Sequence, residues 1–148
     1  MQTVIFACVH NAGRSQMAAA FFNHLQKSAR GISAGTSPAD RVHPEVVEVM
    51  REVGMDLSSA TPQKLTVELA RGADLLVTMG CGDKCPYVPG LKVEDWPLDD
   101  PKGQSIERVR EIRDEIRARV ERLLNEPTAL GTKSTKSTKD TKDTKKSK

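Results

Sequence analysis

The first 28 residues constrain the fold more than any other part of the chain. The run Thr3–Val9 is almost continuously apolar, which is typical of a buried strand. A helix is predicted from Ser15 to about Ser28, directly after a short loop. Its apolar positions recur every four residues, at Met17, Phe21 and Leu25. A buried strand that leads through a loop into a helix is the opening of an α/β fold.

The rest of the chain continues this alternation. Further strands are expected at Gly31–Ala34, Asp74–Thr78 and near Val93–Trp96. Further helices are expected from His43-Pro44 to Gly54, from Thr61-Pro62 to near Gly72, and over Ser105–Leu124. The order predicts an α/β fold with a four-stranded, mostly parallel sheet flanked by helices. Ligands of such sheets bind at the carboxyl ends of the strands, where Cys8 and residues 79–85 lie.

Charge divides the chain into two parts. Residues 131–148 hold seven Lys and two Asp, so they carry +5, and the net charge of +3 leaves −2 for residues 1–130. We predict one folded domain over 1–126 and a disordered Lys/Thr-rich tail over 127–148. An acidic fold makes nucleic-acid binding unlikely except through the tail. With neither a membrane-spanning run nor a signal peptide, we expect a cytoplasmic monomer that binds no membrane.

The loop Cys8–Ser15 combines a nucleophile with anion-binding groups. Backbone N–H groups after the strand can surround an oxyanion, and the start of the helix adds positive potential; these are the amides of Val9, His10, Asn11, Ala12, Gly13 and Arg14. Arg14 adds a guanidinium that can bind two oxygens. The same groups, with Ser15, would stabilise the thiolate of Cys8. The alternative is a buried cysteine at a strand end with an unrelated arginine nearby.

Two more cysteines follow the third predicted strand. Cys81 and Cys85 are four positions apart, a spacing that permits a reversible disulfide. A zinc site would need four ligands where the chain has only three cysteines, so we predict no metal. Two unrelated buried thiols are the other alternative. An odd number of cysteines in a cytosolic protein favours catalytic or redox roles.

The segment Glu94–Pro101 carries four carboxylates. A leaving oxygen of an oxyanion needs a proton, and a carboxylic acid near the thiolate can supply it. Asp100 is the first candidate and Asp99 the second, unless both only cap the loop before the last helix. Of the histidines, His10 lies in the oxyanion loop, whereas His24 and His43 are expected to be structural.

These motifs together resemble the low-molecular-weight tyrosine phosphatase superfamily, and within it arsenate reductases of the thioredoxin-coupled type. The resemblance covers about residues 3–124. It rests on Cys8–Ser15 with Gln16-Met17-Ala18, on Ser33-Ala34-Gly35, on Val77-Thr78-Met79 before the cysteine pair, and on Trp96 and Asp99-Asp100-Pro101. It implies the same phosphatase-like fold.

The resemblance also implies a reaction. The residue matching Cys8 attacks arsenate, Arg14 and the loop hold its oxygens, and Asp100 is the acid. The thiol of Cys81 then attacks Cys8, which releases arsenite, and Cys85 attacks Cys81 in turn. The resulting disulfide needs an external thiol reductant, thioredoxin or the mycothiol/mycoredoxin system, and no tightly bound cofactor. The implied function is arsenic detoxification.

Three alternatives follow from the same residues. A mycothiol-dependent reductase would use the first loop with another reductant. A phosphatase would need only Cys8, Arg14 and the acid, although tyrosine-specific members carry aromatics after their Asp-Pro, and here Lys102 follows Pro101. A non-enzymatic arsenic sensor would use the basic tail on nucleic acid. Some superfamily members also bind potassium, but Ala19 stands where a Glu ligand would be.

Overall fold

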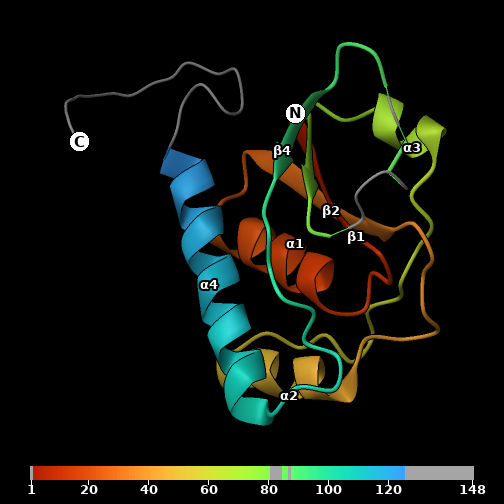
Figure 1. Cartoon of the computed structure of the whole chain (residues 1–148). Coiled ribbons are helices and arrows are strands. Elements are labelled where there is room, and N and C mark those ends of the chain that lie inside the picture. The colour runs from red at the N-terminus through yellow and green to blue at the C-terminus, as the bar shows by residue number, and fades with distance from the viewer. Residues whose placement is uncertain (1, 81–84, 87, 126–148) are drawn as a thin grey trace.

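The computed structural model describes residues 2–80, 85, 86 and 88–125 (Figure 1). Its strands are β1 (Gln2–Cys8), β2 (Ala29–Gly35), β3 (Leu75–Thr78) and β4 (Lys92–Asp95). Its helices are α1 (Arg14–Leu25), α2 (Pro44–Glu52), α3 (Val67–Arg71) and α4 (Ile106–Asn125). The predicted order of strands and helices is therefore confirmed. The tail predicted at 127–148 lies outside the described residues, and the domain boundary at 126 stays a prediction.

The four strands form one sheet in the order β2-β1-β3-β4, and every pairing is parallel. In β1, Val4, Phe6 and Cys8 face a large core, whereas Ile5 and Ala7 face a smaller one on the other side of the sheet. Burial of both faces explains why the first strand is apolar at almost every position. Cys8 pairs in register with Gly35 at the carboxyl ends of β1 and β2.

The larger core lies between the sheet and three helices. Helices α1, α2 and α4 cover this face, and α3 lies on the other side (Figure 1). The ring of Phe6 packs against Phe22 and Trp96, with centroids 5.6 and 5.8 Å away. The buried face of α4 is the one that the spacing of its apolar residues predicts. It consists of Val109, Ile112, Ile116, Val120 and Leu123. None of the helices in the described residues has the length and apolarity to span a membrane.

The helix expected to start at Thr61-Pro62 is wrong in its first turn, because α3 begins only at Val67. Residues 61–66 instead run extended beside the end of β2. The N–H of Gly35 donates to Gln63 O at 2.9 Å, and the N–H of Leu65 donates to Gly35 O at 2.8 Å. The helix starts after this pairing, where the side chain of Thr66 accepts from the N–H of Leu69 at 3.0 Å.

Candidate active site

The loop between β1 and α1 has all its carbonyls engaged. The carbonyls of Cys8, Val9, His10 and Ala12 accept from the backbone N–H groups of Thr36, Ser37, Ala39 and His43, at 2.8–3.2 Å. The carbonyls of Asn11 and Gly13 accept from Gln16 Nε2 at 3.1 Å and from the N–H of Met17 at 3.0 Å. In a trans peptide the N–H opposes the C=O, so the N–H groups of residues 9–14 point away from these partners. These are the amides that the sequence predicts for an oxyanion.

Close packing keeps the loop in this shape. A Cβ at Gly35 would lie 2.6 Å from Val9 O, and one at Gly13 would lie 2.8 Å from Cγ of Pro101. Neither position has room for a side chain. Asn11 has a φ of 51°, in the left-handed region that Asn tolerates better than most residues. The turn therefore depends on small or specialised residues at these three positions.

A short chain of side chains ends at the thiol of Cys8, which is a free cysteine and almost fully buried. Cys8 Sγ lies 3.0 Å from Ser15 Oγ, and Asn11 Nδ2 donates to the same oxygen at 2.7 Å. Because Ser15 Oγ accepts from Asn11, its own hydrogen can be donated to the sulfur. A hydrogen bond to sulfur favours the thiolate, which is the nucleophilic form.

Arg14 opens α1 and is buried, so its guanidinium is held by its neighbours. Nη1 donates to Leu98 O at 3.1 Å, and Nη2 lies 3.8 Å from Asp100 Oδ2. Gly80, with a φ of 97°, lies so close that a Cβ there would be 2.6 Å from Nη1. The segment after β3 and the segment Glu94–Pro101, called the acid loop below, therefore meet at Arg14, beside the loop Cys8–Ser15.

The two aspartates of the acid loop have different surroundings. Asp99 Oδ2 pairs with Arg108 Nη2 at 2.5 Å, which fastens the loop to α4. Asp100 faces Arg14, and its Oδ1 accepts from the N–H of Lys102 at 3.0 Å. The next residue, Pro101, packs on Gly13. The geometry thus separates the two candidates: Asp100 lies at the oxyanion loop, whereas Asp99 anchors the loop that carries it.

The cysteines after β3 are only partly described. Cys85 is disulfide-bonded and half-buried, and it packs against the smaller core, on the side of the sheet opposite to the Cys8 side chain. Cys81 lies outside the described residues. It follows Gly80 in the sequence, and Gly80 is the last described residue before that gap. Among the described residues there is no cluster of His, Cys, Asp and Glu that could hold a metal ion.

Comparison with known proteins places this site in a family. A family model for the low molecular weight phosphotyrosine protein phosphatases matches residues 3–136. The chain belongs to this phosphatase family. A candidate arsenate reductase of Halobacterium salinarum is 47% identical over 127 residues, 82% of this chain and 89% of that one. A glutaredoxin arsenate reductase of Synechocystis sp. is 36% identical, over 84% of this chain and 97% of its own.

A solved structure gives the same result for the fold. A thioredoxin-dependent arsenate reductase of Corynebacterium glutamicum matches with a TM-score of 0.74 and 42% identity, over 84% of this chain. That protein is longer, and the present chain spans 61% of it. The phosphatase-like fold predicted from the sequence is therefore confirmed.

None of the three histidines, all of which are among the described residues, takes part in the hydrogen bonds that join Asn11, Ser15 and Cys8. His43 caps α2, donates its N–H to Ala12 O at 2.9 Å, and would contact a Cβ at Gly13. Burial lowers the pKa of the His43 imidazole below its ordinary value, against the opposing effect of the nearby Asp100 carboxylate. His24 lies in the last turn of α1. His43 thus supports the loop through its backbone, as the structural role predicted for it requires.

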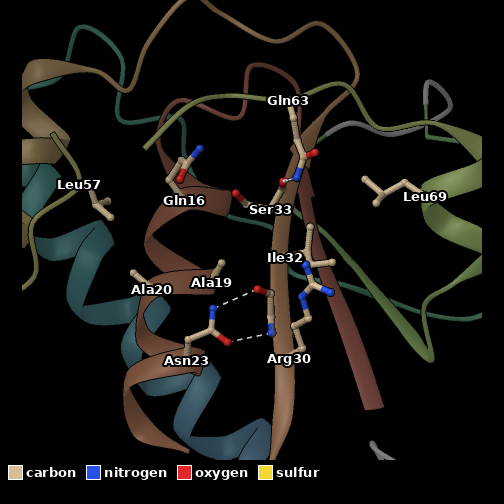
Figure 2. A pocket seen from close by; sticks show the side chains of 11 residues that line it. Gln16, Ala19, Ala20, Asn23, Arg30, Ile32, Ser33, Leu57, Gln63 and Leu69 are labelled. Atoms are coloured by element: carbon tan, nitrogen blue, oxygen red, sulfur yellow. Dashed lines mark hydrogen bonds between the residues drawn. The ribbon is translucent and has the colours of Figure 1, made fainter. Parts of the chain in front are cut away.

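The potassium that some family members bind does not fit the residues present here. Asn11 Oδ1 already accepts from the N–H of Gln63 at 2.9 Å and from Gln16 Nε2 at 3.3 Å. A cavity of about 410 Å³ lies between α1 and β2, with Gln16, Ser33 and Gln63 toward one end and Ala19 on its wall (Figure 2). No carboxylate occurs among the described residues that line it. Position 19 thus holds an alanine in place of the Glu ligand, and the side-chain oxygen of Asn11 is already bound by two hydrogen-bond donors.

Two residues that contact the site are not among those predicted from the sequence. Gln16 occurs there only within the motif Gln16-Met17-Ala18, and Gly80 is an unmarked residue before the cysteine pair. Both act through neighbours from other elements, Gln16 through Asn11 and Gly80 through Arg14. A buried polar residue in the first turn of a helix was the available clue to Gln16.

Proposed function

We propose that this protein is an arsenate reductase that works by a relay of three thiols. The observation that carries the proposal is the buried Cys8 thiol with Ser15 3.0 Å away, at an amide-lined loop, in a chain whose Cys85 is disulfide-bonded. A hydrolase would need only the Cys8 thiol and its amide-lined loop, and no second thiol. The second feature shows that Cys85 can form a disulfide, and in its reduced dithiol form such a pair can supply the two electrons that reduction needs. The relatives named as arsenate reductases support the same substrate.

The first step forms a bond between sulfur and arsenic. The Cys8 thiolate attacks arsenate held by Arg14 and the loop amides, and one arsenate oxygen leaves as water. Asp100 supplies a proton to that oxygen, from its place 3.8 Å from Arg14. Arsenic is still pentavalent at this stage, so no electrons have yet been transferred.

The second step transfers two electrons. The thiolate of Cys81 attacks Cys8 Sγ, the sulfur–arsenic bond breaks, and its electron pair leaves with arsenic as arsenite. Cys85 then attacks Cys81, which frees Cys8 as a thiolate and leaves the oxidised equivalents in a Cys81–Cys85 disulfide. An external dithiol reduces this disulfide by two electrons and completes the cycle.

The external reductant is a thiol system, as the names of the thioredoxin- and glutaredoxin-linked relatives suggest. We propose thioredoxin, with the mycothiol/mycoredoxin system as the alternative. We also propose a cytoplasmic location and a monomer, because the relay needs a reducing compartment and only residues of one chain.

Replacing Cys85 with Ser tests the relay. With thioredoxin, its reductase and excess arsenate, this variant is expected to release about one arsenite per chain and then stop, with a Cys8–Cys81 disulfide. The wild type should continue to turn over. Mass mapping of the disulfides gives the second readout. Undiminished multiple turnover by the variant would refute the intramolecular relay.

Phosphate-ester hydrolysis is the second candidate, and the family to which the chain belongs favours it. Hydrolysis needs Cys8, Arg14 and Asp100 but no second thiol. Wild-type protein with all three thiols intact after an arsenate turnover, together with steady hydrolysis of an aryl phosphate, would support the phosphatase. A new disulfide after that turnover supports the reductase.

A further inference from the structure

Gln16 is a buried polar residue with no part in the reaction proposed above. It lies in the first turn of α1 and is 6% exposed. Its Nε2 donates to the main-chain O of Asn11 at 3.1 Å and to Asn11 Oδ1 at 3.3 Å. One amide group thus fixes both the peptide and the side chain of the same residue. A buried amide loses its hydration, so such a residue is stable only where its hydrogen bonds are made.

The direction of every hydrogen bond in this group follows from the chemistry of the donors. The backbone N–H of Gln63 can only donate, so the atom it meets at 2.9 Å is Asn11 Oδ1. Asn11 Nδ2 therefore faces Ser15 Oγ and donates to it. Ser15 is left to donate toward Cys8 Sγ, 3.0 Å away. Each residue therefore donates to the next: Gln16 and Gln63 donate to Asn11, Asn11 donates to Ser15, and Ser15 donates to the sulfur of Cys8.

Asn11 is the weak member of this chain, because its φ of 51° is unfavourable for a residue with a side chain. If Asn11 relaxed, its Nδ2 would leave Ser15, and the Ser15 hydroxyl would be free to turn from the sulfur. Gln63 fixes only the Asn11 side chain, whereas Gln16 fixes the side chain and the carbonyl together. The carbonyl bond also holds the next N–H, that of Ala12, on the anion side of the loop.

We propose that Gln16 is the positioning residue of the oxyanion loop, and that its amide donors hold Asn11 in its left-handed turn. The loop of this protein is thus braced by hydrogen-bond donors from α1 and from residue 63. It needs no potassium, in keeping with the cavity between α1 and β2 that has no carboxylate among its described lining residues (Figure 2). The proposal depends on Cys8 as the reacting thiol and not on the identity of the substrate.

The test is the reactivity of Cys8 in Gln16→Leu, measured without arsenate. In a background with Cys81→Ser and Cys85→Ser, the rate of alkylation by iodoacetamide is followed against pH. Loss of the amide donors is expected to slow alkylation near neutral pH by about 3–10-fold. Failure of arsenate reduction would leave this readout intact, so the two proposals can fail separately.

Gln26→Leu is the matched control. Gln26 caps the other end of α1, and its Nε2 also donates to two carbonyls, Phe22 O at 3.1 Å and Ala29 O at 2.9 Å. This variant removes the same type of hydrogen bonds far from the loop. It is expected to lower the melting temperature while leaving Cys8 alkylation within about 2-fold of the parent. Equal alkylation by the parent, Gln16→Leu and Gln26→Leu would overturn the proposal.

Gln16→Glu keeps the size of the side chain and tests the donor directly. At neutral pH its carboxylate would face two oxygens of Asn11, so alkylation should be slower than in Gln16→Leu. Protonation at lower pH restores one donor, and the deficit relative to the parent should narrow. The parent should react equally in potassium and sodium chloride of the same ionic strength. A potassium-specific gain in the parent, or a Gln16→Glu deficit that does not depend on pH, would contradict the assignment.

Discussion

Single residues of the acid loop show how far spacing alone can predict a site. Asp100 and Asp99 are adjacent in the sequence, and either can serve as the acid. The structure gives them different partners, Arg14 for Asp100 and Arg108 for Asp99. Cys8 could be proposed as the nucleophile because its loop has a local pattern. Gln16 was not, because its role depends on the left-handed turn at Asn11, which no local pattern records.

Asp100→Asn and Asp99→Asn form a pair that tests the acid. Asp100→Asn should lower kcat for arsenate by about 100-fold or more, because an amide cannot donate the proton to the leaving oxygen. Asp99→Asn keeps a polar side chain near Arg108 and should lower kcat only a few-fold. Steady-state arsenite release at saturating arsenate measures kcat for both variants. An equal loss in the two variants would contradict the assignment of Asp100.

Among the secondary-structure elements, tertiary contacts determine where helix α3 begins. Two sites in the sequence, His43-Pro44 and Thr61-Pro62, carry the same proline signal for a helix start. Helix α2 starts at Pro44 as predicted, but residues 63–65, in the predicted first turn of the later helix, pair with Gly35 instead. The end of the edge strand β2 offers backbone groups that need partners, and this tertiary pairing overrides the local signal. The remaining elements were predicted to within a few residues.

Helices α2 and α4 are joined by ion pairs of one carboxylate. Glu52 accepts from Arg110 Nη2 at 2.7 Å and from Arg113 Nη1 at 2.9 Å. Hydrogen bonds from Arg110, and then from Arg113, lower the pKa of Glu52 from 4.5 to about 2. A carboxyl with a lowered pKa in the fold stabilises it above the unfolded pKa, and this contribution is lost as the pH falls toward the folded value.

Glu52→Gln should therefore remove part of the acid sensitivity of the fold. The wild type is expected to lose stability between about pH 4.5 and pH 2, and the variant should lose less over that range while being less stable at neutral pH. Urea unfolding at several pH values measures the effect. Glu48→Gln, on the same helix, is the control, because Glu48 forms no ion pair with any of the described residues. A parallel pH response in the two variants would contradict the role of Glu52.

For the whole molecule, stability and reactivity should be separable, because most of the core lies away from the oxyanion loop. Ile116 of α4 is fully buried in the larger core. Ile116→Ala should lower the free energy of unfolding by about 2–5 kcal/mol. Val93→Ala, on the edge strand β4 and 57% exposed, should change it by about 0.5 kcal/mol or less. Below their melting temperatures, both variants should keep the parent rate of Cys8 alkylation.

The sheet also separates the two ends of the proposed relay, since Cys8 faces the larger core and Cys85 packs on the smaller one. The backbone of the sheet lies between these two sides, and Gly80 contacts Arg14 beside the oxyanion loop. Oxyanion and reductant can then approach from different sides without competing for the same opening. A high concentration of arsenate should therefore not inhibit reduction of the protein disulfide by the external thiol. A substitution can then change the rate of arsenate reduction without changing the rate of disulfide reduction, and the reverse.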